Sequence, residues 1–322
     1  MIHNIIYNII IFISGLILLI YGSSVLIQSS VKLSFLLRLA PLFIGIIIIA
    51  FGTSAPELAV GITAALKHQK AIALGNIVGS NISNIGLILG LCAMFTPLKI
   101  SKDIFKKELP IMIFSTVLLY ILSLDRVLSR IDGLVFIILF IVFCFISFRG
   151  ARTPEYHREI ADFKFNRILK SINSRPLIGV LISASIIFVI WGANLMVKSG
   201  VNMAHIFGIS PWVIGITVFA VGTSLPELAA SMTASIKKVS SISIGNIVGS
   251  NIFNILLVLG VVSLIRPITI DTSSVLVFEM PVLLLFSVSL VIFMRTSFKI
   301  SRIEGFILLA SYITFIILLI TK

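Results

Sequence analysis

The chain alternates between long runs of apolar residues and short breaks that contain charged residues or proline. Ten runs are of the length expected for a helix that crosses a bilayer, which needs about 20 residues. They cover residues 4–29, 40–66, 71–96, 109–124, 131–149, 176–202, 211–236, 241–265, 275–294 and 303–321. Such runs are too long for the strands of a membrane barrel. The pattern predicts an all-α integral membrane protein with ten transmembrane helices. The first run has no cleavage site after it, so we expect it to be retained.

The second half of the sequence repeats the first. At an offset of 170 residues, GNIVGSNISN (75–84) matches GNIVGSNIFN (245–254) at nine of ten positions. Further along, the offset drifts to 171 and 172, which pairs residues 130–133 with 302–305. The sequence therefore predicts a five-helix repeat in residues 1–150, a linker loop in 151–175 and a second five-helix repeat in 176–322. Because five is an odd number, the second repeat should be inverted in the membrane.

Composition and charge agree with this plan and add an orientation. The 322 residues have a mean hydropathy of +1.19 and a formal net charge of +13. With both termini outside the cell membrane and the linker in the cytoplasm, 18 of the 25 Lys and Arg residues fall on the inner side. Such a bias sets the topology of membrane proteins, so the positive charge gives no reason to expect a nucleic-acid partner. The two cysteines lie within apolar runs, where we expect buried thiols.

The most informative stretch is an acidic motif inside an apolar run. GTSAPELA (52–59) recurs as GTSLPELA (222–229), identical at seven of eight positions, and places Glu57 and Glu227 within predicted spans. An acid at the centre of a span costs about 2.5–3.5 kcal/mol on insertion scales, so two copies indicate a function. Pro56 and Pro226 should break each helix and leave main-chain oxygens free. Carboxylates beside hydroxyls and carbonyls are the lining that hard cations such as Na⁺ and Ca²⁺ require.

The two repeats can bring these groups to one place. Inverted repeats with broken helices at matching positions indicate a secondary transporter whose site lies near the midplane. Two facing carboxylates repel unless a cation or a proton neutralises them. The hydroxyls of the motifs and a polar stripe on the following span are the remaining candidate ligands, although Asn84 and Asn254 could equally be interhelical hydrogen-bonding groups. These candidates are Thr53, Ser54, Thr223, Ser224, Ser80, Ser250, Asn84 and Asn254.

At these motifs the sequence resembles the cation/calcium exchanger superfamily, and within it the prokaryotic sodium/calcium exchanger branch. The resemblance covers the whole chain. It implies that Glu57 and Glu227 bind Ca²⁺ together with main-chain oxygens of Thr53 and Thr223, and that Na⁺ sites flank this centre. On one side the resemblance implies Ala50, Ser54 and Ser80, and on the other Ala220, Ser224 and Ser250, with Asn84 and Asn254 completing the middle.

The predicted function is a Na⁺/Ca²⁺ antiporter rather than an enzyme, with the two ions as substrates, no cofactor and no obligatory protein partner. Some relatives, including potassium-dependent ones, carry Asp where this chain has Asn254, which weakens the case for a K⁺ requirement. A proton/calcium antiporter using the same acids is the alternative within the class, and a passive cation channel is the alternative outside it. An intramembrane hydrolase is disfavoured, because no Ser or Cys is paired with a His in an apolar span. The linker is too short for a regulatory domain.

Overall fold

A computed structural model of the chain describes residues 2–149, 151, 163–206, 222–270, 275–295 and 298–321. Within these ranges the structure is helical apart from four strands of two residues each. Seven helices are long and apolar enough to cross a membrane, or up to eight if the bent pair Pro41–Thr53 and Ala55–Leu66 counts as one span. The prediction of an all-helical membrane protein is confirmed. The count of ten spans stays a prediction, because the start of the seventh run lies outside the described residues.

The first half begins with one long helix and continues with spans built from several helical pieces. Three of these pieces are π-helical, which places an extra residue in the turn. In order they are α1 (Ile2–Leu37), α2 (Pro41–Phe43), η1 (Ile44–Ile49), α3 (Ala50–Thr53), α4 (Ala55–Leu66), α5 (Lys70–Ser83), η2 (Asn84–Leu89), α6 (Gly90–Phe95), η3 (Ile104–Glu108), α7 (Leu109–Leu122) and α8 (Arg130–Arg149).

The second half follows the same order where it is described. A short helix in the linker precedes it, and π-helical pieces recur at positions equivalent to η2 and η3. The elements are α10 (Arg167–Ser171), α11 (Arg175–Ile206), α14 (Leu225–Ile236), α15 (Ser240–Ile252), η5 (Phe253–Leu259), α16 (Gly260–Ile265), η6 (Val275–Glu279), α17 (Met280–Arg295) and α18 (Arg302–Thr321).

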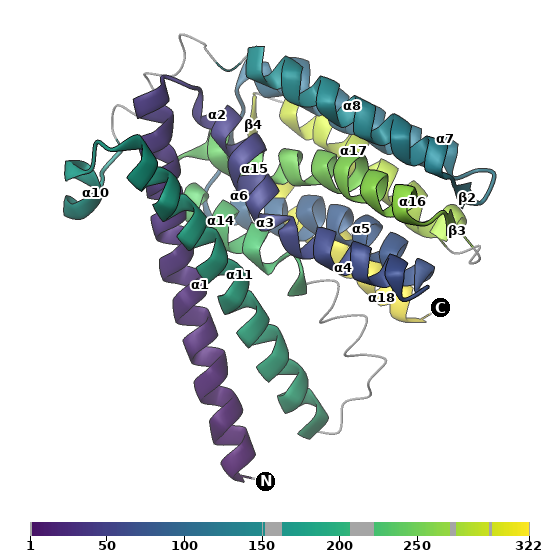
Figure 1. Cartoon of the computed structure of the whole chain (residues 1–322), viewed down its shortest axis with the longest axis horizontal. Helices are drawn as coiled ribbons and strands as arrows, with labels where there is room; N and C mark the ends of the chain where they lie inside the picture. The colour runs from purple at the N-terminus through teal and green to yellow at the C-terminus, as the bar shows by residue number, and fades with distance from the viewer. Residues whose placement is uncertain are drawn as a thin grey trace.

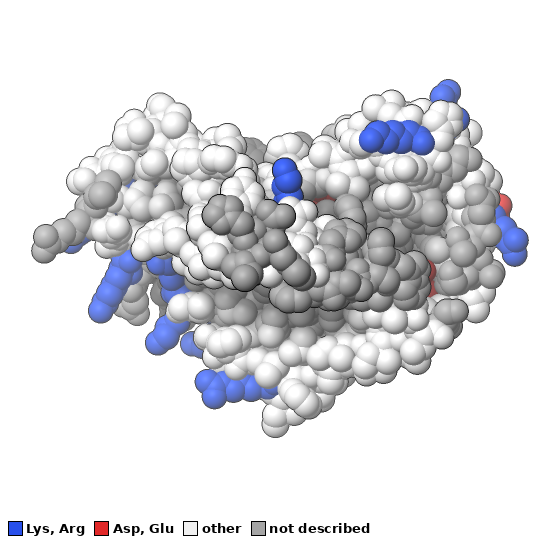
Figure 2. Space-filling model, turned by 90° about the horizontal axis from the view of Figure 1, so that it is seen from below, with Lys and Arg blue, Asp and Glu red and all other residues white. Residues whose placement is uncertain are grey.

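The motif-bearing helices lie at the centre and the others surround them. In the span formed by α5, η2 and α6, 78% of the apolar window is buried, and in the span of α15, η5 and α16 it is 83%, against 22% for α8 and for α18. Helices α1 and α11 run side by side and extend away from this centre (Figure 1). On the face seen in Figure 2, the Lys and Arg side chains form separate small groups, and most of the described surface carries no charge. The outer helices therefore present apolar surface to the bilayer.

Glycines bring helix backbones into close contact at equivalent places in the two halves. A Cβ on Gly305 of α18 would lie 2.8 Å from the carbonyl oxygen of Gly90 in α6, and one on Gly133 of α8 would lie 2.8 Å from that of Gly260 in α16. Only glycine permits this approach, since real Cβ atoms do not come so near a backbone oxygen. The contacts fix α8 and α18 against the central spans.

Two small antiparallel ribbons join the halves. Strand β1 (Leu98–Lys99) pairs with β4 (Lys299–Ile300), and β2 (Val127–Leu128) pairs with β3 (Ile268–Thr269). In the repeat register, β1 is equivalent to β3 and β2 to β4, so the two pairings map onto each other when the halves are exchanged. Each ribbon also leads into a capped helix. Ser129 caps α8 in a capping box with Asp132, and Ser301 caps α18 in the same way with Glu304.

The first helix is longer than predicted. Helix α1 continues to Leu37, whereas the apolar run was expected to end near residue 29. Its polar end is covered by the linker segment: Lys32 Nζ donates to the carbonyl of Lys170 at 3.3 Å and lies 5.5 Å from the centre of the Phe165 ring. Gln28 Oε1 accepts from the backbone N–H of Asn166 at 2.9 Å. The linker segment thus covers the polar residues near this end of α1.

Candidate ion-binding site

Both acidic motifs contain a non-helical serine directly before the helix that carries the proline and the glutamate. Helix α3 ends at Thr53, Ser54 adopts φ −83° and ψ 5°, and α4 starts at Ala55 with Pro56 in its first turn, which gives a bend of 42°. In the second half Ser224 has φ −87° and ψ 2° before α14. The predicted break is therefore present, one or two residues before each proline.

The break places each glutamate in the first turn of the helix that follows. Glu57 is 1% exposed and Glu227 is fully buried. The N-terminal end of a helix carries a partial positive charge, so it offsets part of the cost of a buried carboxylate. Among the described residues, one ion pair is present, between Lys107 and Asp103, and neither glutamate has a basic partner. The charge of the pair is left for a bound cation or a proton to neutralise.

Hydroxyl groups from both halves contact the two carboxylates. Ser54 donates to Glu227 Oε1 at 3.0 Å, and Ser250 donates to the same oxygen at 3.4 Å. On the opposite side, Ser80 donates to Glu57 Oε1 at 3.4 Å. The second oxygen of each glutamate, Oε2, is buried without a hydrogen-bond partner. Each carboxylate therefore keeps one oxygen available to a ligand.

Further contacts link the hydroxyls across the repeats. Thr53 donates to Asn246 Oδ1 at 3.2 Å, and the equivalent Thr223 donates to Asn76 Oδ1 at 3.3 Å. The hydroxyl oxygens of Ser80 and Thr223 also lie 3.3 Å apart. These contacts join the motif of each half to the polar stripe of the other half.

The two central asparagines differ from each other. Asn254 donates to Asn81 Oδ1 at 3.0 Å, while its own Oδ1 has no partner. Asn84 is only 1% exposed, and neither the nitrogen nor the oxygen of its side-chain amide has a hydrogen-bond partner. An unsatisfied buried amide is costly, so Asn84 is poised to accept a ligand that supplies the missing contact.

The remaining candidates are placed as follows. Ala50 is fully buried, and its carbonyl accepts from the Ser54 backbone N–H at 2.9 Å and from the Thr53 hydroxyl at 3.4 Å. Ser224 is buried with its hydroxyl unpartnered. Ala220 lies outside the described residues. Apart from Ala220, the predicted residues lie on the broken helices and the polar stripes beside them, and the hydrogen bonds above join most of them directly.

The predicted ligand set omits several participants, namely Asn76, Asn81, Asn246 and Ser231. Ser231 accepts from the Asn246 amide at 2.9 Å and so helps to orient the oxygen that Thr53 contacts. Its repeat equivalent is Gly61, so the comparison of the two halves gave no signal for it. The signal that was available is its spacing, because Ser231 follows Glu227 by four residues and lies on the same face of α14.

A cavity of about 130 Å³ leads to the site between α11 and the two breaks. Its lining includes Pro56, Asn194, Thr223 and Pro226. Thr223 belongs both to this lining and to the hydrogen-bonded cluster. Within the described residues no group of three His, Cys, Asp or Glu side chains forms a metal cluster. Besides its two acids, the site offers hydroxyl, amide and carbonyl oxygens, which suit weakly held, exchangeable hard cations.

The fold and the site together define a multi-pass membrane transporter with a buried, all-oxygen centre shared by two related halves. Comparison with known proteins places it more narrowly. The family model of the sodium/calcium exchanger protein matches residues 7–149 and 177–321, so the chain belongs to that family.

Relatives from archaea and bacteria match nearly the full length. The sodium/calcium exchanger MaX1 of Methanosarcina acetivorans is 33% identical over 97% of this chain and 98% of its own. The putative antiporter CaxA of Alkalimonas amylolytica is 34% identical over 93% of this chain and 94% of its own. A solved structure of the sodium-calcium exchanger NCX_Mj, soaked without Na⁺ and Ca²⁺, superposes with a TM-score of 0.84 at 33% identity, covering 98% of this chain and 99% of that one. The chain therefore shares the fold of a cation/Ca²⁺ exchange antiporter.

Proposed function

We propose that the chain exchanges Na⁺ for Ca²⁺ across the cell membrane by alternating access to one site built on Glu57 and Glu227. The observation that carries the proposal is the pair of buried carboxylates, each with an unpartnered Oε2 and with hydroxyl groups on its other oxygen. One Ca²⁺ or several Na⁺ ions neutralise such a pair, so the two ions compete for the same oxygens.

Competition at a shared site produces coupling. An ion-free pair of carboxylates in a dry centre is unfavourable, so the protein changes access readily only when ions occupy the site. With three Na⁺ for one Ca²⁺, one net charge would cross per cycle, and the membrane potential would contribute about 2.3 kcal/mol per 100 mV.

The hydrogen bonds suggest which contacts change between access states. Two sets occur in both halves: Thr53 to Asn246 with its equivalent Thr223 to Asn76, and Ser80 to Glu57 with its equivalent Ser250 to Glu227. We infer that these persist. The contact of Ser54 with Glu227 has no equivalent, since the Ser224 hydroxyl is unpartnered. In the opposite state we expect the reverse: Ser224 bound to Glu57 and Ser54 released.

Helices α1 and α11 are the proposed moving part. They pack closely on each other, because Gly15 and Gly192 allow backbone contact: a Cβ on either would lie 2.7 Å from the other's carbonyl oxygen. A hydrogen bond of 2.8 Å between Ser23 of α1 and Thr233 of α14 holds the pair against the site. We further propose that both termini face outward and the linker faces the cytoplasm, in agreement with the distribution of basic residues.

The test is transport by the purified protein in liposomes loaded with Na⁺. Uptake of ⁴⁵Ca²⁺ is measured on dilution into Na⁺-free medium for the wild type, Glu57→Gln, Glu227→Gln and the control Asp125→Asn, which changes an exposed acid in the loop before β2. We expect uptake that requires the Na⁺ gradient, that is lost in both glutamine variants and that is kept in the control.

Other outcomes separate the alternatives. Uptake that a pH gradient drives without Na⁺ would identify a proton/calcium antiporter, and a requirement for added K⁺ would identify the potassium-dependent type. Uptake without any counter-ion would indicate a channel. Full Na⁺-driven uptake in either glutamine variant would contradict the proposed site.

A further inference from the structure

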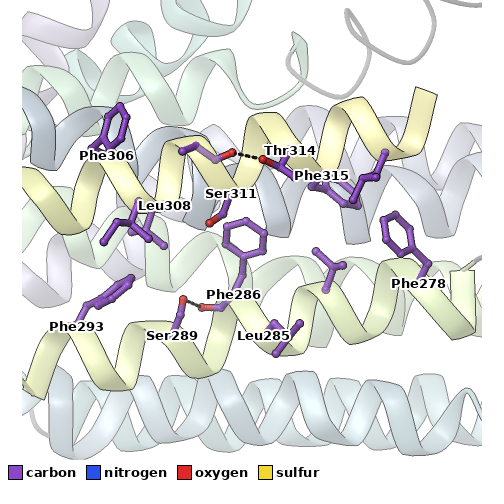
Figure 3. Close-up of a pocket in the computed structure, with 14 residues that line it drawn as sticks. Phe278, Leu285, Phe286, Ser289, Phe293, Phe306, Leu308, Ser311, Thr314 and Phe315 are labelled. Carbon is purple, nitrogen blue, oxygen red and sulfur yellow. Dashed lines mark hydrogen bonds between the residues drawn. The ribbon is translucent and has the colours of Figure 1, made fainter. Parts of the chain in front are cut away.

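Helices α17 and α18 enclose a groove that the exchange mechanism does not use. Its volume is about 610 Å³, and all the residues that line it belong to these two helices or to the end of η6 (Figure 3). Phe286 and Leu308 form the buried floor, with 6% and 2% of their surfaces exposed, whereas Leu285 and Phe306 at the rim are 69% and 60% exposed. In Figure 3, Phe286 points from α17 toward α18, and Ser311 points from α18 toward α17.

The groove is apolar in effect, although three hydroxyl-bearing residues line it. Ser289 Oγ donates to the carbonyl of Phe286 at 2.7 Å, and Thr314 Oγ1 donates to that of Ala310 at 2.9 Å. Both hydroxyls therefore have their donor satisfied within their own helix. A polar ligand would find few hydrogen-bond partners in the groove, whereas a hydrocarbon chain needs none.

The length of the groove fits an acyl chain. Along η6 and α17 the lining extends from Phe278 to Phe293, which is about 22 Å at 1.5 Å per residue. Half of the hydrocarbon core of a bilayer is about 15 Å thick. The groove is therefore long enough to hold the whole acyl chain of a lipid from one leaflet. The stacked rings of Phe278 and Phe315 lie at one end of the groove.

Basic residues gather at the other end. Arg295 ends α17, Lys299 belongs to β4 and Arg302 begins α18, and all three are exposed. Arg302 precedes Phe306 of the rim by one helical turn, so both lie on the same face of α18. The acid in this turn, Glu304, already accepts hydrogen bonds from Ser301. The end of the groove is thus positively charged.

The first half carries larger residues at the positions equivalent to three small residues of the groove. In the repeat register, Ser289 corresponds to Leu118, Ala310 to Ile138 and Ser311 to Leu139, whereas the floor residue Phe286 corresponds to the smaller Ser115. The small residues of α17 and α18 leave space that leucine and isoleucine occupy in α7 and α8. The repeat therefore supplies the substitutions that should fill the groove.

We propose that this groove binds one acyl chain of an anionic phospholipid, whose phosphate contacts Arg295, Lys299 and Arg302. The apolar lining, the length and the charge at one end together select this occupant over a zwitterionic lipid. Because α18 packs through Gly305 directly on α6, next to the helix that carries Asn84, the bound lipid stabilises a wall of the ion site. With the orientation proposed above, the lipid comes from the inner leaflet.

The test is native mass spectrometry of the full chain released from detergent, titrated with phosphatidylglycerol or phosphatidylcholine. Four proteins are compared: the wild type, a groove-filling variant (Ser289→Leu with Ser311→Leu), a charge variant (Arg295→Gln, Lys299→Gln and Arg302→Gln), and a control (Arg126→Gln with Arg130→Gln) that changes the equivalent connection of the first half. Each basic residue should contribute about five-fold to binding of the anionic lipid.

We expect the wild type and the control to bind phosphatidylglycerol at least ten-fold more tightly than phosphatidylcholine. The charge variant should lose this preference, and the groove-filling variant should bind both lipids less. The charge variant alters exposed residues only, so it tests the proposal even if the filled groove impairs folding. Equal binding of both lipids by the wild type, or an equal loss in the control, would overturn the proposal. A dimer that the groove-filling variant converts to monomer would instead assign the groove to a second copy of the chain.

Discussion

Replacing Ser54 by alanine should destabilise the ion-free protein more than replacing Ser224, its equivalent in the second half. The Ser54 hydroxyl donates to Glu227 Oε1 at 3.0 Å, whereas the Ser224 hydroxyl is buried without a partner. A hydrogen bond to a charged group contributes about 1.5–3 kcal/mol to the free energy of unfolding. Ser54→Ala should lose this amount, and Ser224→Ala, which removes an unsatisfied group, should change the free energy by less than about 0.5 kcal/mol.

The difference is measurable as a melting temperature in detergent. For 322 residues, an unfolding entropy of about 2.1 cal/mol/K per residue gives about 0.7 kcal/mol per kelvin, so Ser54→Ala should melt about 2–4 °C lower. Addition of Na⁺ provides a second readout. Because both hydroxyls are proposed Na⁺ ligands, the two variants should lose the stabilisation by Na⁺ to a similar extent.

The control is Ser14→Ala, which removes a hydroxyl that donates to the carbonyl of Ile10 at an exposed position of α1. Its melting temperature should stay within one degree of the wild type, as expected for a surface substitution of about 0.5 kcal/mol or less. Equal shifts in Ser54→Ala and Ser224→Ala without ions would refute the reasoning, because the two halves would then contribute equally to the ion-free state.

Two more predictions test the motion and the centre of the site. In a variant without the native cysteines, Ser23→Cys with Thr233→Cys should form a disulfide, because the hydroxyl oxygens of the two native residues are 2.8 Å apart. The proposed motion carries α1 past α14, so the disulfide should stop transport reversibly. Unchanged transport by the oxidised protein would show that α1 stays in place. Asn254→Asp should lower the melting temperature in ion-free buffer, because an Asp side chain cannot donate to Asn81 Oδ1. Addition of Ca²⁺ should restore the melting temperature. A melting temperature that Ca²⁺ does not raise would place Asn254 away from the ions.

The repeat in the sequence predicted that Glu57 and Glu227 occupy equivalent environments. The structure gives them matching partners, since Ser80 donates to Glu57 as Ser250 donates to Glu227. The prolines also predicted the break, because a missing N–H removes one helical hydrogen bond wherever the residue stands. Both inferences depend on local chemistry, which a sequence expresses directly.

Other features depend on contacts that a sequence does not express. The π-helical turns in η1, η2 and η5 lie in apolar stretches whose periodicity gives no sign of an extra residue. The extension of α1 beyond residue 29 depends on the linker segment that covers Gln28 and Lys32. At the end of α1, tertiary contacts thus add to the local pattern.

The asymmetry between Ser54 and Ser224 is the feature that identical motifs are least able to predict. With the repeats inverted as proposed, a perfectly symmetric structure would expose the site equally to both sides of the membrane, so an exchanger must occupy one of two asymmetric arrangements. Nearly identical motifs make the two arrangements similar in energy, because each offers the same hydrogen bonds with the halves exchanged. A transporter needs this near-equality, since ions can shift the equilibrium only when the difference is a few kcal/mol. The bond from Ser54 to Glu227, at about 1.5–3 kcal/mol, is of that size.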